Sequence, residues 1–255
     1  MNSVSLQHKL KQLNWPMVIF TMLVFSTLIK LGFWQIDRAL EKEQRQLRIS
    51  ELSQRDALSL SQVLALKDLQ DGINDLPIQL NGQFVADKVF LLDNQPDKGR
   101  LGYRVYQMID SNDDVILVNL GWVQGSIDRN ILPEITPVSG QHTITGHVRE
   151  VEVGIQLQAQ NLTNPSWPLR VQQIELDKFS QLIGKKLLPF VVYLDKKETI
   201  GYKKNWQPIV MPPEKHRAYA FQWFSLALAW ISLMIWAAIK MSKNEVSEIS
   251  SNNLK

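Results

Sequence analysis

Few residues in this chain have the types and spacings that chemistry needs. The 255 residues include no cysteine, which excludes disulfides, thiolate metal sites and a cysteine nucleophile. The G-x-S-x-G, H-E-x-x-H, P-loop and G-x-G-x-x-G motifs are absent as well. His142 and His147 lie five residues apart on a predicted strand, so we expect them on opposite faces, unable to share a metal ion. The sequence therefore carries none of these enzyme signatures.

Among the four histidines, His216 has surroundings suited to a metal-containing cofactor. It lies two residues before a long apolar segment, and Tyr219 and Trp223 follow it three and seven residues on, at helical spacing. A neutral imidazole bordered by aromatic side chains and lipid suits axial ligation of a haem iron. A simple interfacial histidine beside Lys215 and Arg217 is the alternative interpretation.

Two long apolar segments are the elements that would position this histidine. Residues 218–239 contain no charge, and as a helix they would measure about 33 Å, enough to cross a hydrocarbon core of about 30 Å. Residues 16–36 form a second candidate span, interrupted by Lys30, which either snorkels toward the membrane surface or has a function within the membrane. A signal peptide is the alternative for this segment. No small-residue cleavage site follows it, which favours an uncleaved anchor.

The charge pattern excludes one class of partner and leaves the orientation open. The formal net charge is +3 and no run of Lys or Arg exceeds two residues, so we expect no nucleic-acid partner. Two spans would put the tails 1–15 and 240–255 on one side of the membrane and residues 37–217 on the other. That central segment is far longer than the roughly 60 residues over which the positive-inside rule operates, so charge alone does not orient the chain.

The segment between the spans is predicted to be an α+β domain. Residues 37–69 are rich in helix formers and contain no Gly or Pro, which predicts helix with a break near residues 59–61. Over residues 76–210 the apolar period is mostly two, and short consecutive strands without long crossovers predict an antiparallel sheet. We expect strands at 78–85 and 89–92 joined near 86–88, a polar loop at 93–100, a hairpin of 103–109 and 115–120, strands at 143–149, 169–174 and 188–194, and a short helix at 176–183.

Six motifs in chain order carry a resemblance to a known family. They are residues 31–38 (LGFWQIDR), 81–84 (NGQF), 102–105 (GYRV), 118–123 (VNLGWV), 146–149 (GHVR) and 216–224 (HRAYAFQWF). In this order between two spans they resemble the Surfeit-locus family of cytochrome c oxidase assembly proteins, over roughly residues 16–240. One position departs from the family pattern, which usually has arginine before Gly-Trp where this chain has Leu120. A contact made by that arginine is either missing here or supplied by another residue.

The resemblance implies an assembly factor for a haem-copper cytochrome c oxidase, assisting haem a insertion into the large subunit. Its partners would be that subunit, the haem a synthesis machinery and membrane lipid. It implies a multi-pass protein of the bacterial plasma (inner) membrane with both termini cytoplasmic, since residues 1–15 do not resemble an Arg-rich transit peptide. The expected fold class is then an α+β membrane protein, with two transmembrane helices flanking an extracytoplasmic, mostly antiparallel β domain that carries short helices.

The resemblance also assigns candidate site residues. In some bacterial members a histidine at the start of the second span is implicated in holding haem, and that position here is His216. The implied cofactor is a transiently bound haem a, with His216 as ligand to its iron and Tyr219 and Trp223 beside it. Four further residues match motif positions, and turn glycines and packing aromatics are the favoured interpretation for Gly102, Tyr103, Gly121 and Trp122.

Three functional hypotheses remain open at this point. The first is a haem-holding chaperone that acts through His216. The second is a membrane scaffold that binds no haem and stabilises an oxidase assembly intermediate through helix contacts, using small residues that permit close packing: Ala218, Ala220, Ser225, Ala227, Ala229 and Ser232. The third is a sensor, which is disfavoured because tails of about 15 residues leave no room for an output domain.

Overall fold

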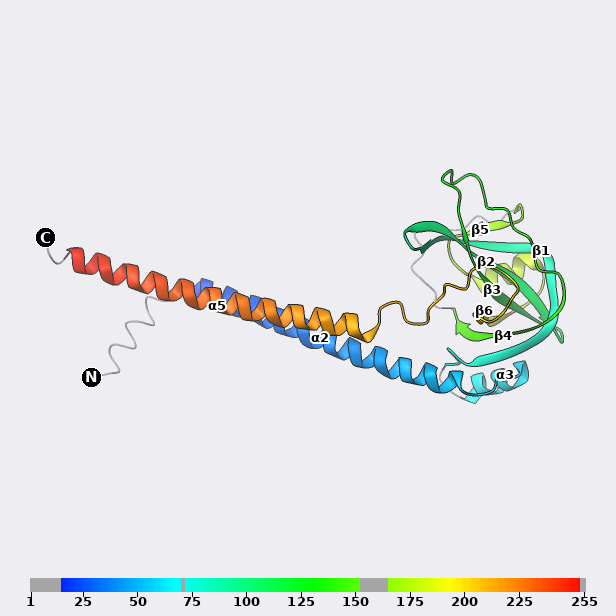
Figure 1. Ribbon diagram of the computed structural model, residues 1–255, viewed down its shortest axis with the longest axis horizontal. Helices are drawn as coiled ribbons and strands as arrows, with labels where there is room; N and C mark the ends of the chain where they lie inside the picture. Colours follow the sequence, from blue (N-terminus) through cyan, green and yellow to red (C-terminus); the bar gives the residue numbers. More distant parts are fainter. Residues whose placement is uncertain (1–14, 70–71, 152–164, 253–255) are drawn as a thin grey trace. The chain divides into compact units, whose positions relative to one another are not determined.

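The chain divides into two compact units. The computed structural model describes residues 15–69, 72–151 and 165–252. Residues 1–47 and 209–255 belong to the helical unit, and residues 48–208 to the barrel domain. Nearly all of the predicted tail 1–15 lies outside the described residues. The elements are α2 (Trp15–Ser53), α3 (Leu60–Leu69), β1 (Pro77–Asp97), β2 (Arg100–Ser111), β3 (Asp114–Gln124), β4 (Gly140–Glu150), β5 (Leu169–Val171), α4 (Leu176–Ile183), β6 (Leu187–Leu194) and α5 (Pro213–Asn252) (Figure 1).

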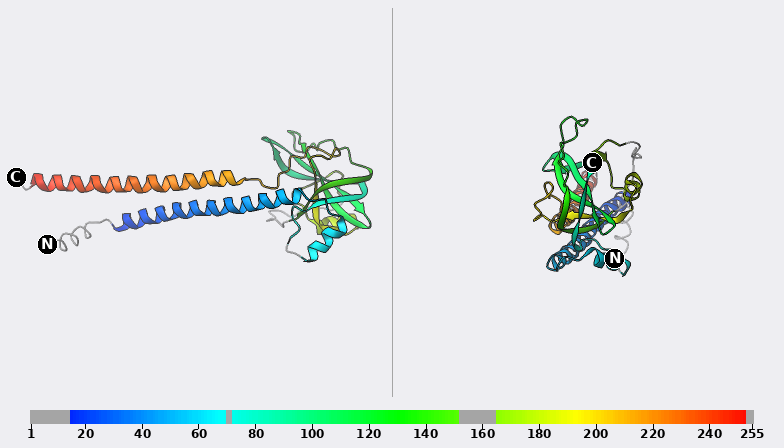
Figure 2. Two further views of the ribbon diagram at one scale, coloured as in Figure 1. Left: turned by 60° about the horizontal axis from the view of Figure 1, so that its bottom comes forward. Right: turned by 90° about the vertical axis from the view of Figure 1, so that its right-hand side faces the viewer.

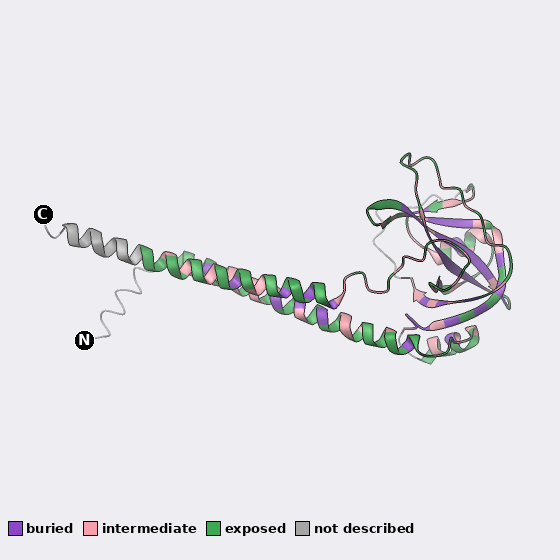
Figure 3. Cartoon of the chain, viewed as in Figure 1, coloured by how far each residue is buried: buried purple, intermediate pink, exposed green. Residues whose placement is uncertain are grey.

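The helical unit exposes apolar side chains over most of its surface. Both α2 and α5 are long and apolar enough to cross a membrane, with mean hydropathies of 1.9 and 1.6 over their most apolar stretches. Only 11% and 6% of these stretches is buried, far less than in the core helix of a soluble protein (Figure 3). A surface of this kind needs an apolar environment, which is typical of membrane association.

Within the helical unit, α2 and α5 run antiparallel and share one seam (Figure 2). Buried or half-buried positions recur on each helix at alternating steps of three and four, the spacing of a left-handed helix pair. Small residues at this seam, such as Ala220 and Ala227, are each 1% exposed and allow the helices to approach closely. The seam comprises Val18, Thr21, Phe25, Leu28, Gly32, Gln35 and Ala39 on α2, and His216, Ala220, Trp223, Ala227, Trp230 and Met234 on α5.

The barrel domain is a mixed and mostly antiparallel sheet that closes on itself. The strand order is β2-β3-β6-β4-β1-β5, and an additional pairing of β1 with β2 closes the circuit. The sheet can close because β1 is long enough to pair with two strands: it pairs with β4 through Pro77–Phe84 and with β2 from Gln83 onward. Two pairings, β3 with β6 and β1 with β5, are parallel. The expectation of a mostly antiparallel sheet is thus confirmed, and the parallel β3–β6 pairing arises because the chain between these strands is long enough to return β6 in the same direction.

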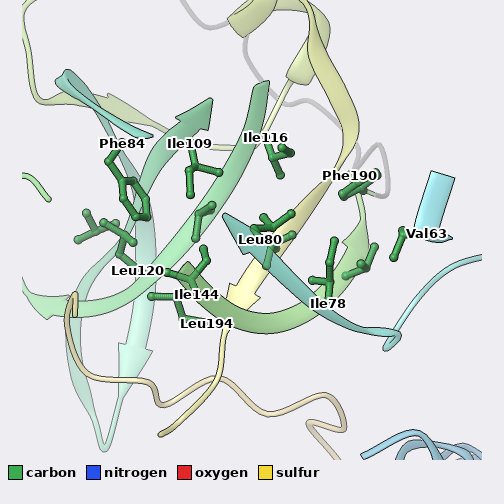
Figure 4. Packing of buried hydrophobic residues seen from close by; sticks show 14 of the residues in the cluster. Val63, Ile78, Leu80, Phe84, Ile109, Ile116, Leu120, Ile144, Phe190 and Leu194 are labelled. Carbon is green, nitrogen blue, oxygen red and sulfur yellow. The ribbon is translucent and has the colours of Figure 1, made fainter. Parts of the chain in front are cut away.

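Alternation along the strands builds two hydrophobic clusters, one on each face of the sheet. Inside the barrel, alternate residues of β1, β2, β3, β4 and β6 meet, including Leu80, Ile116 and Phe190, and Val63 of α3 packs at one end (Figure 4). On the outer face, Phe179 of α4 stacks on Phe90 with ring centroids 4.2 Å apart. Because both faces are covered, β3 is a nearly continuous apolar run instead of an alternating one.

Several predicted elements are confirmed and two are wrong. The hairpin turns at Asn112-Asp113, where both residues have positive φ as a type I′ turn requires, and the helix at 176–183 is α4. The predicted strand pair 78–85 and 89–92 is instead the single strand β1, because residues 86–88 form a bulge between Phe84 and Val89. The predicted loop at 93–100 is mostly strand as well, and β1 turns into β2 only at Lys98-Gly99.

The helix predicted over residues 37–69 is present but broken earlier than expected. The first candidate span continues without interruption to Ser53, and α3 begins at Leu60. Ser59 and Gln62 explain the restart, since the Ser59 main-chain N–H donates to Gln62 Oε1 (2.8 Å) and the Gln62 N–H donates to Ser59 Oγ (3.4 Å). This reciprocal pair is a capping box, which marks the first turn of a helix.

Candidate functional site

The candidate site in the helical unit is a buried polar pair, His216 of α5 and Gln35 of α2. The two side chains are 8% and 9% exposed, and His216 Nδ1 lies 2.7 Å from Gln35 Oε1. They meet because the helices are antiparallel and both residues occupy seam positions. Gln35 lies at the end of the first apolar segment and His216 just before the second, so the pair lies at the same end of both.

The hydrogen bond determines which imidazole nitrogen carries the free lone pair. An amide oxygen can only accept, so His216 Nδ1 must be the N–H donor to Gln35 Oε1. In the neutral ring this leaves Nε2 unprotonated, the form in which histidine ligates a metal. His216 Nε2 is buried and has no hydrogen-bond partner among the described residues. His216 Nε2 therefore has an oriented lone pair to which no described residue donates a hydrogen bond.

Close packing around the pair keeps the two helices in register. A Cβ atom on Gly32 would lie 2.4 Å from the Phe224 ring, so only glycine accommodates that ring at this point of the seam. Further along the seam, Trp230 Nε1 donates to the Thr21 carbonyl oxygen at 3.2 Å. These contacts fix the register of the helices and with it the approach of His216 to Gln35.

The structure places the other predicted residues of this site less closely. Trp223 is half-buried at the seam seven residues after His216, whereas Tyr219 is 46% exposed. Lys30 is exposed on α2 and is not part of the seam. Of these residues, only Gln35 contacts the imidazole through a hydrogen bond. The assignment of His216, Tyr219 and Trp223 to haem binding stays a prediction.

The chemistry of the pair fits a haem iron better than a bare metal ion. Among the described residues there is no group of three or more His, Asp or Glu side chains able to hold a metal. A porphyrin supplies four nitrogen ligands of its own and needs only an axial donor, which His216 Nε2 can provide. Because Nε2 is enclosed, iron can reach it only after neighbouring side chains move.

The motif residues of the barrel domain have structural roles. A Cβ on Gly102 would lie 2.2 Å from the Val123 carbonyl oxygen, and Gly121 has φ +119 beside Tyr202, so both positions require glycine. Trp122 Nε1 donates to the Gln95 carbonyl oxygen at 2.7 Å, and Tyr103 is 2% exposed in the core. The interpretation of these residues as turn glycines and packing aromatics is consistent with this environment.

Leu120, which stands where the family usually has arginine, lies in the barrel interior. It is fully buried in the hydrophobic cluster, at a bulge where the register of β2 against β3 shifts. Arg104 of β2 lies nearby on the outer face of the sheet, where Trp122 is its cross-strand partner. No polar contact of an arginine at position 120 is reproduced by Leu120, since an aliphatic side chain has no hydrogen-bonding group.

The histidines of β4 occupy opposite faces, as predicted. His142 is on the side of Ile144 and bonds to the Ser139 carbonyl oxygen (3.0 Å), whereas His147 is on the outer face 2.9 Å from Asp195. Burial raises the pKa of Asp195, but hydrogen bonds from His147 and Thr145 and the positive charges of His147 and Lys197 together outweigh it, and the net shift is downward. The sequence alone predicted neither the pairing of His147 with Asp195 nor the contact of Gln35 with His216. Gln35 had one available signal, since it is a polar residue within an apolar span.

The two units together define a class of protein, a small closed barrel bracketed by two membrane-type helices whose seam contains a histidine–glutamine pair. The model of the SURF1 family matches residues 22–228, and the chain belongs to this family. SURF1-like proteins of Rickettsia conorii and Rickettsia felis are 27% and 26% identical, covering 91% and 85% of this chain and 97% and 94% of their own lengths. A SURF1-like protein of Drosophila melanogaster is 26% identical over 88% of this chain and 76% of its own length.

Proposed function

We propose that this protein is an assembly factor, not an enzyme, for a haem-copper cytochrome c oxidase. It assists the insertion of haem a into the large subunit, and His216 Nε2 binds the haem iron transiently. The single observation that carries this proposal is the buried Nε2 lone pair, which has no partner in the described part of the chain and is oriented by the bond from Nδ1–H to Gln35. Membership of the SURF1 family supports the oxidase-assembly role.

The proposed roles of the residues follow from the geometry. Gln35 fixes the ring orientation and keeps the proton on Nδ1, which makes Nε2 the ligand. Trp223 lies two helical turns further along the same face and supplies a flat apolar surface beside the porphyrin. The enclosure of Nε2 suits temporary binding, because the side chains that move aside for haem favour its release when they return.

The proposal includes a location and partners. The chain is a multi-pass protein of a bacterial plasma membrane, with both termini cytoplasmic and the barrel domain outside. Its partners are the oxidase large subunit, the haem a synthesis machinery and membrane lipid. The two poorly buried apolar helices support the membrane assignment. Release of the protein from vesicles by alkaline carbonate would contradict it.

Purification from cells that make haem a tests the cofactor. We expect a Soret band with the wild-type protein, a sharp loss of that band with His216→Ala, and no loss with the matched control His142→Ala. His142 is a suitable control because it lies in the barrel domain with its imidazole bonded to a main-chain carbonyl. A Soret band of equal size in His216→Ala would overturn the assignment of the ligand.

A scaffold that binds no haem is the second candidate, and the exposure of α5 favours it specifically. Ala220 and Ala227 are used at the seam, but Ala218, Ser225, Ala229 and Ser232 are exposed. Their small side chains recur at steps of seven, four and three, so a further helix of a partner protein could approach closely along this stripe.

Two variants separate the candidates. Ala229→Leu fills the exposed stripe and leaves the seam intact, so it blocks oxidase assembly only if the scaffold function is correct. His216→Ala leaves the stripe intact and blocks assembly only if haem is held there. If the wild-type protein carries no haem, assembly still requires it, and only Ala229→Leu fails, the scaffold is the function.

A further inference from the structure

A row of polar side chains crosses the outer face of the barrel. Tyr106, Asn119, Tyr193 and His147 are direct cross-strand neighbours on β2, β3, β6 and β4. Asn119, Tyr193 and His147 form part of the lining of a cavity of about 510 Å³ within the barrel domain. Trp206 packs on Tyr193 with ring centroids 4.6 Å apart and lines the same cavity. The volume lies within the range of about 300–1,000 Å³ that small-molecule sites occupy.

The cavity has an excess of positive charge. Its carboxylates are Asp75 and Asp195, and both are engaged, with Arg149 at 3.1 Å and His147 at 2.9 Å. Against these two carboxylates, five cationic side chains line the cavity: Arg55, Arg104, Lys196, Lys197 and Lys204. An excess of this kind in a concave surface attracts anions.

Arg104 is the cation best placed to hold an anion. Its Nε donates to Gln95 Oε1 (3.1 Å) and its Nη1 to Asn205 Oδ1 (3.3 Å), so the guanidinium is oriented by neutral amides. Within the described part of the chain, no carboxylate forms an ion pair with it, and its remaining N–H groups have no acceptor. A guanidinium fixed in this way and left without a counter-ion matches the planar geometry of a carboxylate.

Two further groups support an anion at this point. Asn119 is 3% exposed, and its Nδ2 has no acceptor within hydrogen-bond distance among the described residues; the hydroxyl of its cross-strand neighbour Tyr106 bonds to Tyr193 (3.0 Å). A buried N–H without an acceptor is costly and points to a missing oxygen. Among the described residues, Lys204 Nζ donates only to the main-chain carbonyls of Glu198 and Ile200 and has no bonded carboxylate.

We propose that this cavity binds a small organic carboxylate with an apolar body. The carboxylate lies on the Arg104 guanidinium, and the body lies against Trp206 and Leu194. The site lies wholly within the barrel domain and requires neither haem nor His216. Its test therefore succeeds or fails separately from the function proposed above.

Equilibrium dialysis of the full chain in nanodiscs of zwitterionic lipid tests the site, with empty nanodiscs subtracted. The probe is naphthalene-1-carboxylate, and the neutral probe of matched shape is naphthalen-1-ylmethanol. We expect saturable binding of the carboxylate, roughly tenfold or more tighter than of the alcohol. Arg104→Gln should reduce the carboxylate to the level of the alcohol. Arg100→Gln, an exposed arginine of the same strand that also bonds to a glutamine, should change nothing.

A second variant keeps the test decisive if Arg104→Gln disturbs the fold. Lys196 lines the cavity but is exposed and makes no ion pair among the described residues, so Lys196→Glu should leave the melting temperature unchanged. It should weaken the carboxylate about threefold or more at low salt, whereas Lys186→Glu, an exposed lysine elsewhere on the barrel, should not. Equal binding of the two probes, or unchanged affinity in both cavity variants, overturns the proposal.

Discussion

Replacing Gln35 with leucine isolates the contribution of the hydrogen bond to His216. Leucine has a similar size and suits an apolar helix, so the main change at the seam is the loss of the acceptor. His216 Nδ1–H then becomes a buried donor without a partner, and nothing holds the proton on that nitrogen. We expect the helix pair to persist and haem to bind more weakly.

The structure sets the size of both effects. Polar contacts between membrane helices contribute about 0.6 kcal/mol on average and at most about 1.7 kcal/mol, too little for their loss to separate a seam of this length. Loss of the group that orients a ligating histidine weakens metal binding by about ten- to a hundredfold. The bond is short at 2.7 Å and both side chains are nearly fully buried, which places the expected loss toward the upper half of that range.

The assay is a haem titration of the full chain in nanodiscs, followed by the Soret band. Gln35→Leu should raise the dissociation constant, whereas Gln35→Glu, which keeps an acceptor oxygen, should stay close to wild type. Gln222→Leu is the matched control, because Gln222 is an exposed glutamine of α5. Melting temperatures of all variants are measured in the same nanodiscs.

Two results would refute the reasoning in different ways. If Gln35→Leu binds haem as tightly as wild type while His216→Ala does not bind, Gln35 does not orient the ligand. If Gln35→Leu binds haem more tightly, the bond serves mainly to keep Nε2 enclosed, and opening of the seam limits binding. Weak binding by Gln222→Leu would show that the effect is not specific to the seam.

Three further predictions concern stability. Gly32→Leu places side-chain atoms on the Phe224 ring and should destabilise the helix pair by about 1–3 kcal/mol, measured as a lower melting temperature of the helical unit's circular dichroism. The pKa of Asp195 is lower in the folded chain, so as the pH falls the unfolded chain binds a proton at this carboxylate first. The ionised Asp195 therefore contributes under about 1 kcal/mol to the free energy of unfolding, and this contribution is lost below about pH 4. Thermal melts at a series of pH values measure the loss. Phe179→Ala empties a fully buried position and should cost about 3–5 kcal/mol of barrel stability, measured by denaturant unfolding.

Each of these predictions has its own control and its own contrary result. Ser26→Leu adds the same bulk at an exposed position of α2, and destabilisation equal to that of Gly32→Leu would show that the seam is not the cause. Asp195→Asn should flatten the acid limb of the stability curve, and an unchanged limb would exclude this carboxylate as its source. A loss below about 1 kcal/mol for Phe179→Ala would mean that α4 collapses onto the vacated space.

The sequence predicted those parts of the fold that depend on local patterns. The long apolar runs located both long helices, and short apolar or alternating segments between turn residues located β2, β3, β4 and β6. The turn at Asn112-Asp113 was identifiable because Asn and Asp tolerate positive φ. These features are encoded within a few neighbouring residues, which is why a single sequence is enough to find them.

The errors arose where pairing between distant strands decides the structure. Residues 86–88 have the polarity of a turn, yet they form a bulge because β2 continues to pair along both halves of β1. The parallel position of β6 against β3 depends on a long connection whose path has no local signature. Long-range pairing outweighs local preference in such cases.

The candidate site was predicted only in part, for a related reason. His216 stood out because a lone histidine borders an apolar segment. Gln35 lies 181 residues away in the chain, and only the register of two antiparallel helices brings it to the imidazole. Likewise, the polar row of the barrel needs the register of four strands before Tyr106 and His147 can be seen to share one face.

If register alone positions the ligand, a change of phase in α2 should abolish the site without removing any residue. One alanine inserted between Phe33 and Trp34 rotates Gln35 by about 100° and shifts it by about 1.5 Å, which takes it off the seam. Haem binding should then weaken as much as in Gln35→Leu. Adding Trp34→Gln to the inserted chain returns a glutamine to the seam position facing His216, and binding should recover. Recovery distinguishes loss of the hydrogen bond from general damage to the helix, because the rescued chain keeps the insertion. An inserted chain that binds like wild type, or a rescue variant that stays weak, would show that the pairing of His216 with Gln35 does not control the ligand.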